Sequence, residues 1–146
     1  MKSYFFCLLM CLILFSCKPT EREQLVEEKI KMINSNMEEW NELTEKRLKT
    51  DFVKNKRGYA SSYIEQLDLA LQEELESKGI ISIDVRWENC TYVQYYYERY
   101  SFGMVSISWE ACDAEHSKKG VNKQRMLIET WGIGNGWSIL VDSDWI

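Results

Sequence analysis

The chain has 146 residues, with 23 acidic and 18 basic side chains and a formal net charge of −5 at pH 7. Its 45% of hydrophobic residues is typical of a globular protein with a core and excludes a disordered chain. The acidic balance excludes a general nucleic-acid-binding protein, because the Lys and Arg residues that neutralise phosphates supply most of that affinity. The net negative charge suits a soluble domain or a domain that binds a basic partner.

The chain begins with a short apolar segment behind one positive charge. Lys2 precedes the apolar residues 4–15, and Ser16 and Cys17 follow them. As a helix this segment would be about 18 Å long, whereas the hydrocarbon of a bilayer is about 30 Å thick. A positive start, a short apolar core and a small residue are typical of a secretion signal, so we expect residues 1–16 to be removed.

The end of this segment, Leu14-Phe15-Ser16-Cys17, resembles the lipobox of bacterial lipoproteins in a form frequent in Bacteroidota. The resemblance covers the first 17 residues and implies cleavage before Cys17, acylation of its sulfur and anchorage to a lipid bilayer. Two or more acyl chains hold a protein on a membrane for long periods. The resemblance places the chain in the cell envelope, periplasmic or surface-exposed, and Lys18 favours the outer over the inner membrane. An ordinary cleaved signal before an unmodified cysteine is the alternative.

The remaining 130 residues fit a single domain. We assign residues 17–19 to a lipidated tether and residues 20–146 to the domain. Two of the five cysteines leave with the signal, and Cys17 is the expected acylation site. Cys90 and Cys112 remain as an even pair in an oxidising compartment, so a disulfide is expected, with two free buried thiols as the alternative.

The first half of the domain is predicted to be helical. Thr20 and Glu23 have the spacing of a capping box, and an apolar stripe continues to about Leu48. Residues 54–58 are charged, contain glycine and predict an exposed loop. A second helix is predicted over residues 62–78, with Ser62 and Glu65 as another capping box and Gly79 after its end. Its apolar positions recur at helical spacing and are Ile64, Leu67, Leu71 and Leu75.

The second half has the alternation of β-strands. Aromatic and β-branched residues alternate with polar ones, and no helical stripe appears. We predict strands near residues 80–87, 91–100, 104–110, 124–131 and 137–145. Residues 132–136 hold three glycines, but a strand follows them, so they predict a hairpin turn rather than a phosphate-binding loop before a helix.

These elements predict an α+β fold, with two N-terminal helices packed on a curled antiparallel sheet of about five strands. Their order resembles the cone-shaped folds of the nuclear transport factor or SnoaL-like group and of cystatin-like domains. Such folds host ligand pockets, enzymes and interaction modules, so the fold alone does not choose a function.

Two groups of polar residues could carry chemistry. The first lies around the single histidine, but it lacks the paired cysteines or histidines of a zinc site, so we expect a solvated loop and no metal or cofactor. A cysteine nucleophile paired with this histidine conflicts with the expected disulfide. The residues concerned are Cys112, Asp113, Glu115 and His116.

The second group is acidic. Asp142 and Asp144 alternate on the last predicted strand, so they would share a face and could act as acid and base. The strand lies next to the chain end, where an edge position and solvation of both carboxylates are expected.

Aromatic residues are dense in the second predicted strand. Alternation places Tyr95 and Tyr97 on one face and three other tyrosines on the opposite face. Tyrosine and tryptophan combine an apolar body with a polar group, which suits ligand pockets and protein interfaces, although an ordinary core explains the same residues. The candidate binding surface consists of Tyr92, Tyr96, Tyr100 and Trp109.

We therefore expect a non-enzymatic binding module, held on an envelope membrane, for a protein partner or a small ligand. In size and charge it is similar to envelope immunity proteins and periplasmic enzyme inhibitors, whose partner would be basic. The alternative is a small pocket enzyme, a hydrolase or isomerase, that uses Asp142, Asp144 or Glu110 as acid or base. A structural role in an envelope complex is a third hypothesis.

Overall fold

The computed structural model describes residues 19–49, 58–87, 90–112 and 117–145. The secretion signal, Cys17, the charged residues 54–57 and the polar residues 113–116 lie outside these ranges, so the predictions made for them stay predictions. The described residues form an α+β domain, which confirms the predicted fold class.

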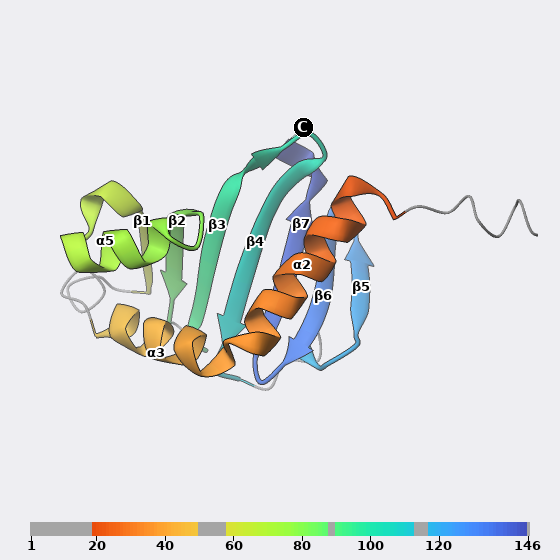
Figure 1. Cartoon of the computed structure of the whole chain (residues 1–146). Helices are drawn as coiled ribbons and strands as arrows, with labels where there is room; N and C mark the ends of the chain where they lie inside the picture. The colour runs from red at the N-terminus through yellow and green to blue at the C-terminus, as the bar shows by residue number, and fades with distance from the viewer. Residues whose placement is uncertain (1–18, 50–57, 88–89, 113–116, 146) are drawn as a thin grey trace, which may run out of the picture.

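Two helices come first, the edge strand β1 and helix α5 follow them, and the remaining strands form the second half of the chain (Figure 1). In chain order they are α2 (Glu21–Ser35), α3 (Met37–Leu48), β1 (Tyr59–Tyr63), the 3-10 turn η1 (Ile64–Gln66), α5 (Leu69–Glu76), β2 (Ile80–Arg86), β3 (Tyr92–Tyr100), β4 (Gly103–Glu110), β5 (Asn122–Arg125), β6 (Ile128–Gly134), β7 (Trp137–Asp142) and the 3-10 turn η3 (Ser143–Trp145).

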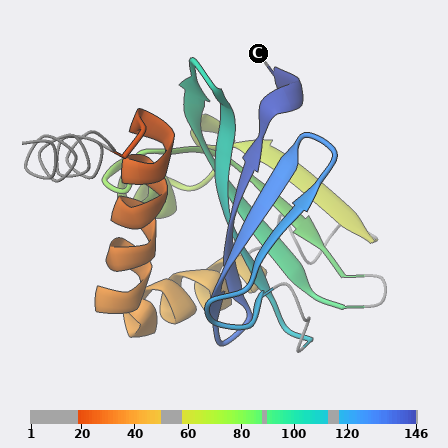
Figure 2. The same ribbon diagram turned by 90° about the vertical axis from the view of Figure 1, so that its right-hand side faces the viewer.

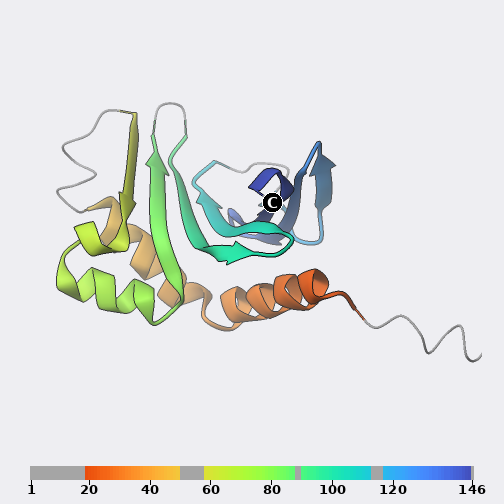
Figure 3. The same cartoon turned by 90° about the horizontal axis from the view of Figure 1, so that it is seen from above.

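The strands form one antiparallel sheet, and the described helices form a single layer against it. The described part of the chain contributes seven strands in the order β1-β2-β3-β4-β7-β6-β5, and the sheet is not closed. Helices α2, α3 and α5 lie against one face (Figure 3). The two edges of the sheet bend away from these helices, so the opposite face is concave and no described helix covers it.

The core lies between the helices and the sheet. The ring of Tyr95 is 5.5 Å from that of Trp40 and 6.3 Å from that of Trp137, measured between centroids. All three side chains are fully buried. The hydroxyl groups of Tyr95 and Thr44 are 2.8 Å apart, and Thr44 also donates to the carbonyl of Trp40. This arrangement gives the buried hydroxyl groups of Tyr95 and Thr44 hydrogen-bond partners, as buried polar groups require.

The first helix begins as the sequence predicts. The backbone N–H of Glu23 donates to Thr20 Oγ1 at 3.2 Å, and the N–H of Thr20 donates to the Glu23 carboxylate at 2.7 Å. These hydrogen bonds lower the pKa of Glu23. The capping box is confirmed, and two of the buried residues on the predicted stripe, Val26 and Ile33, face the sheet.

The prediction of one continuous helix to Leu48 is wrong, because the chain breaks at Asn36. The side chain of Asn36 donates to the carbonyl of Met32 at 3.2 Å, and its φ of −132° is not helical. Asparagine side chains compete in this way with the helical backbone. Figure 2 shows α2 and α3 meeting at a large angle, which lets α3 run along the end of the sheet.

The second helix is shorter than predicted. Ser62 belongs to β1, where it pairs with Ile83, and its hydroxyl accepts a hydrogen bond from Arg47 at 3.0 Å. Helix α5 begins only at Leu69, with Asp68 as its N-cap. Pairing with β2 and the buried contact with Arg47 therefore override the local helical pattern.

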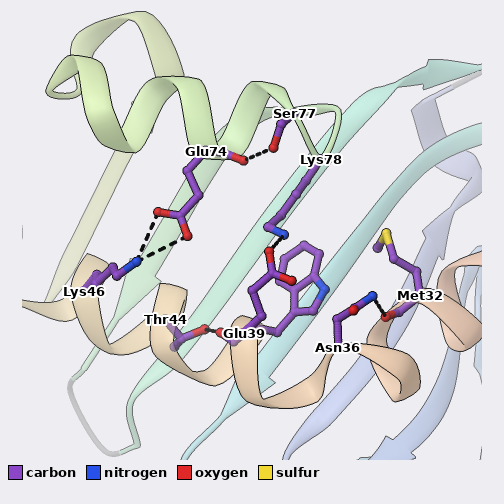
Figure 4. A network of polar contacts seen from close by, with 9 residues as sticks. Met32, Asn36, Glu39, Thr44, Lys46, Glu74, Ser77 and Lys78 are labelled. Atoms are coloured by element: carbon purple, nitrogen blue, oxygen red, sulfur yellow. Dashed lines mark hydrogen bonds and ion pairs between the residues drawn. The ribbon is translucent and has the colours of Figure 1, made fainter.

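Helices α3 and α5 are joined by polar contacts on the outside of the core (Figure 4). Lys46 approaches the carboxylate of Glu74 at 3.4 Å, and Lys78 forms an ion pair with Glu39. The Lys78 ammonium also lies 5.2 Å from the centre of the Trp40 ring. These contacts close the edge of the core where the two helices meet.

The last part of the sheet corrects two predicted strands. The predicted strand over residues 124–131 is divided between β5 and β6 by a turn at Met126 and Leu127. The predicted final strand ends at Asp142, where η3 begins. The predicted hairpin at residues 132–136 is confirmed, because Asn135 and Gly136 have the positive φ values of a type I′ turn, 53° and 82°.

Candidate functional site

The concave face of the sheet contains a pocket of about 350 Å³. We call it the open-face hollow. Residues of β2, β3, β4, β6 and β7 line it, and their side chains share one face because paired residues in an antiparallel sheet point the same way. The lining residues that matter below are Arg86, Tyr92, Gln94, Tyr96, Ser106 and Asp142.

Three serines lie on the same face of the sheet as the hollow, and one of them, Ser106, lines it. Ser106, Ser108 and Ser138 are almost fully buried, and the hydroxyl oxygens of Ser108 and Ser138 are 2.7 Å apart. The amide nitrogen of Gln94 donates to Ser106 at 2.7 Å, while the hydroxyl of Tyr92 donates to the amide oxygen of Gln94 at 3.0 Å. This chain of hydrogen bonds fixes the orientation of the Gln94 amide and of the Tyr92 ring before any ligand arrives.

A second tyrosine is held in the same way. The hydroxyl of Tyr96 donates to the buried carboxylate of Asp84 at 3.1 Å. Burial raises the pKa of Tyr96, and the negative charge of Asp84 raises it further. Burial also raises the pKa of Tyr92. Both phenols therefore stay protonated at neutral pH and act as hydrogen-bond donors.

A cation lies at the rim of the hollow. The guanidinium of Arg86 is 5.8 Å from the ring centre of Tyr92 and 5.6 Å from that of Tyr59 on the edge strand. Apolar side chains line the rest of the pocket, namely Met104, Ile128 and Leu140. The hollow thus offers a cation, aromatic surface and apolar surface together, which is the composition of a pocket for an amphipathic ligand.

The structure divides the predicted binding surface between the two faces. Tyr92 and Tyr96 line the hollow, but Trp109 pairs with Val93 and Trp137 and lies on the helix-covered face. Tyr100 also packs against the core, where its ring stacks on Phe102 at 5.4 Å.

The placement of Tyr100 corrects the alternation expected along β3. A register shift between Tyr96 and Arg99 inserts an extra residue, so every position after it changes face. Arg99 now pairs with Met104, and Tyr100 pairs with Gly103.

A second pocket of about 350 Å³ lies on the helix side, where α2 meets the end of β3. Lys29 and Tyr97 line it, and the Lys29 ammonium is 4.0 Å from the Tyr97 ring centre. Both residues are buried, and burial lowers the pKa of Lys29. The described residues offer no hydrogen-bond partner to the Tyr97 hydroxyl. The sequence signal for Lys29 is its place among Val26, Ile30 and Ile33 on the apolar stripe.

The three candidate acids do not meet in the open-face hollow. Asp142 lines the hollow, whereas Asp144 is exposed in η3 and its backbone N–H donates to the Asp142 carboxylate at 3.0 Å. The expected alternation of these two residues on one strand is therefore wrong. Glu110 pairs with Tyr92 at the other end of β4. Within the described ranges, no group of three His, Cys, Asp or Glu side chains could hold a metal ion.

The predicted cysteine pair is confirmed. Cys90 and Cys112 form a disulfide with their Cα atoms 5.9 Å apart. It joins the chain just before β3 to the chain just after β4, next to the pairing of Tyr92 with Glu110.

The fold and the hollow define a class: an α+β domain with a curled, open antiparallel sheet whose concave face carries a polar and aromatic pocket. Comparison of the chain with protein-family models, curated proteins and solved structures gives no match. The resemblance to cone-shaped folds therefore stays a prediction. Among the described helices, none has the length and apolar character needed to cross a bilayer.

Proposed function

We propose that the protein is a non-enzymatic binding module of a bacterial cell envelope. Acylated Cys17 tethers it to a membrane, and the open-face hollow takes up a small ligand or a segment of a protein partner. The N-terminal segment that ends in Leu14-Phe15-Ser16-Cys17 supports the tether. The open-face hollow supports the binding role.

The observation that carries this proposal is the internal order of the hollow. Tyr92, Gln94 and Ser106 are already linked by hydrogen bonds, and Tyr96 is held by Asp84. A ligand therefore meets side chains whose conformational entropy has already been lost, which favours affinity. Asp142 is the one candidate acid that lines the hollow, so an acid and base pair from the residues singled out in the sequence is not assembled there.

The charge of the domain favours a basic partner. After residue 16 the chain has 17 basic and 23 acidic side chains, which leaves a side-chain charge of −6. Opposite net charge speeds association in an aqueous compartment. A basic toxin or hydrolase, held by an immunity-like or inhibitor-like module, fits this charge.

The binding role is tested with two tyrosines that flank the same arginine. Tyr92 lines the hollow and Tyr59 does not, although each ring lies within 6 Å of Arg86. Tagged protein with Tyr92→Ala is expected to retain an envelope component at least about tenfold less well than the wild type, because it loses an aromatic wall of the pocket. Tyr59→Ala is the matched control and should retain it fully. Equal retention by both variants would refute the hollow as the site.

The tether is tested by fractionation of cells that express the full chain. Cys17→Ser removes the acylation site, so the protein should leave the membrane fraction. Cys11→Ser lies inside the signal and should leave membrane association unchanged. Intact-mass analysis of the wild type is expected to show loss of residues 1–16 and acyl groups on Cys17. A mass that includes Met1, or an unmodified Cys17, would overturn the tether.

A further inference from the structure

The turn between β5 and β6 exposes three apolar residues in a row. The exposed fractions are 88% for Met126, 49% for Leu127 and 38% for Ile128. Exposed runs of apolar residues are disfavoured in soluble domains unless they contact something. We call Met126–Ile128 the apolar turn.

The backbone conformation of the apolar turn at Met126 favours glycine or asparagine over methionine. Met126 has a φ of 56°, a conformation that costs energy for any side chain with a Cβ. The neighbouring hairpin between β6 and β7 uses Asn135 and Gly136 for its tight turn, which are the residues that such turns favour. The β5–β6 turn therefore keeps a backbone strain at Met126 that the β6–β7 turn reduces by its choice of residues. This difference indicates that the Met126 side chain has a role.

The apolar turn lies at the same end of the molecule as the start of α2. Arg22 in the first turn of α2 forms an ion pair with Glu129, one residue after the apolar turn. Its guanidinium is also 5.7 Å from the ring centre of Trp131 on β6. Figures 1 and 2 show the start of α2 and the β5–β6 turn at this end.

This end is also where a membrane tether would be attached. Pro19 is the first described residue and directly precedes the N-cap of α2. Cys17 is two residues before it, and two extended residues span only about 7 Å. A lipid on Cys17 therefore keeps this end of the domain close to the bilayer.

We propose that the apolar turn inserts into the interface of the membrane and sets the orientation of the tethered domain. The inference rests on the proposed lipid tether. The negative charges of Glu21 and Glu23 in the first turn of α2 offset the positive charge of the exposed Arg125 beside the apolar turn. Burial of apolar side chains, rather than charge, carries the contact.

The first test measures the oxidation of Met126. All residues of the core cluster lie between Leu25 and Val141, so the chain from Cys17 onward contains the whole described core. This chain, with its disulfide formed, is coupled through Cys17 to phosphatidylcholine vesicles that carry a maleimide headgroup lipid. Peroxide then converts exposed methionine to its sulfoxide, which peptide mass spectrometry quantifies. Met126 is expected to oxidise at least about fivefold more slowly on vesicles than free in solution.

The matched control is Leu69→Met. Leu69 is 75% exposed and belongs to α5, which lies at the other side of the domain from the start of α2 in Figures 1 and 3. The methionine introduced there should oxidise at the same rate on vesicles and in solution. Equal rates for Met126 in the two states, or equal protection of the introduced methionine, would overturn the proposal.

A second variant separates membrane contact from folding. Met126→Gly combined with Leu127→Asn places glycine at the position with positive φ and a polar turn residue after it, so the midpoint of thermal unfolding should rise by about 3 °C. Hydrogen exchange at residues 126–128 should slow on vesicles in the wild type and not in this variant. Slowing in both would mean that tethering alone protects the turn, which contradicts the proposal.

These tests do not depend on acylation in cells, because the maleimide lipid replaces it. An unmodified Cys17 in native protein would refute the proposed tether and leave the vesicle result standing. An acylated Cys17 with an unprotected Met126 would confirm the tether and refute the membrane contact. Protection of Met126 by an added protein in the absence of vesicles would assign the apolar turn to a protein partner and overturn the lipid assignment.

Discussion

Tyr95 shows how a polar side chain is accommodated in this core. Its ring lies between Trp40 and Trp137, and its hydroxyl reaches Thr44. Burial raises the pKa of Tyr95 well above its ordinary value. The side chain therefore contributes to the dependence of stability on pH.

Stability is expected to fall in alkaline solution. A tyrosine in the unfolded chain loses its proton near pH 10, whereas Tyr95 keeps its proton in the folded state. The unfolded state then binds fewer protons, so the free energy of unfolding is constant below about pH 10 and decreases as the pH rises further. Tyr96 and Tyr97 act in the same direction, because burial also raises the pKa of each. Urea unfolding between about pH 7 and about pH 11 measures the effect.

The variant Tyr95→Phe tests this assignment. Near neutral pH it should lose about 1 kcal/mol, because the hydrogen bond to Thr44 is removed. Above about pH 10 the difference from the wild type should shrink, since phenylalanine does not titrate. Tyr63→Phe is the control at an exposed position and should follow the wild type. A constant difference at every pH would contradict the prediction.

At the scale of elements, the strand β4 is held close to the end of β7 at Gly103. A Cβ built on Gly103 would lie 2.3 Å from the carbonyl oxygen of Asp142, and the φ of Gly103 is 129°. Both the space and the backbone conformation therefore require glycine. Gly120 also has a positive φ, 80°, but a Cβ there would meet nothing within 4 Å.

Gly103→Ala should lower the free energy of unfolding by about 3 kcal/mol, through backbone strain and a clash with the neighbouring strand. Gly120→Ala should lower it by about 1 kcal/mol, because it adds backbone strain alone. Chemical denaturation of the two variants gives both values. Equal losses of unfolding free energy in the two variants would show that β4 can move away from the Asp142 carbonyl and relieve the clash.

The elements that could be predicted from the sequence are those with a strong local pattern. Period-two alternation predicts β2 and most of β3, and the capping box at Thr20 predicts the start of α2. The edge strand β1 is not predicted, because its last two residues fall in the helix predicted from Ser62 and only pairing with β2 decides its structure. The break at Asn36 depends on one side-chain hydrogen bond. The bulge after Tyr96 has no glycine to signal it, so the face of Tyr100 was predicted wrongly.

At the scale of the whole molecule, the candidate site depends on how distant strands meet. Composition indicates an aromatic surface, and alternation correctly places Tyr92 and Tyr96 on one face. The open-face hollow exists because the sheet curls and because β6 and β7 bring Ile128 and Asp142 to the same face. Residue spacing within one strand holds no information about these approaches, so Arg86 and Gln94 could not be assigned to the site from the sequence.

The disulfide lies at the end of the sheet opposite to the apolar turn. Cys90 and Cys112 flank the pairing of Tyr92 with Glu110, whereas Ile128 pairs with Asp142 at the other end. The covalent bond therefore holds together β3 and β4 at the end of the sheet that the proposed tether does not fix. This arrangement predicts a large effect of reduction on the stability of the whole domain.

The double variant Cys90→Ser with Cys112→Ser should lose about 3 kcal/mol, because a bond across a sequence separation of 22 restricts the unfolded chain. For a domain of this size the loss corresponds to a decrease of about 10 °C in the midpoint of thermal unfolding. Dithiothreitol should bring the wild type down to the midpoint of the variant and leave the variant unchanged. A wild-type midpoint that does not respond to reductant, in protein shown by mass to be reduced, would mean that native contacts alone hold β3 and β4 together.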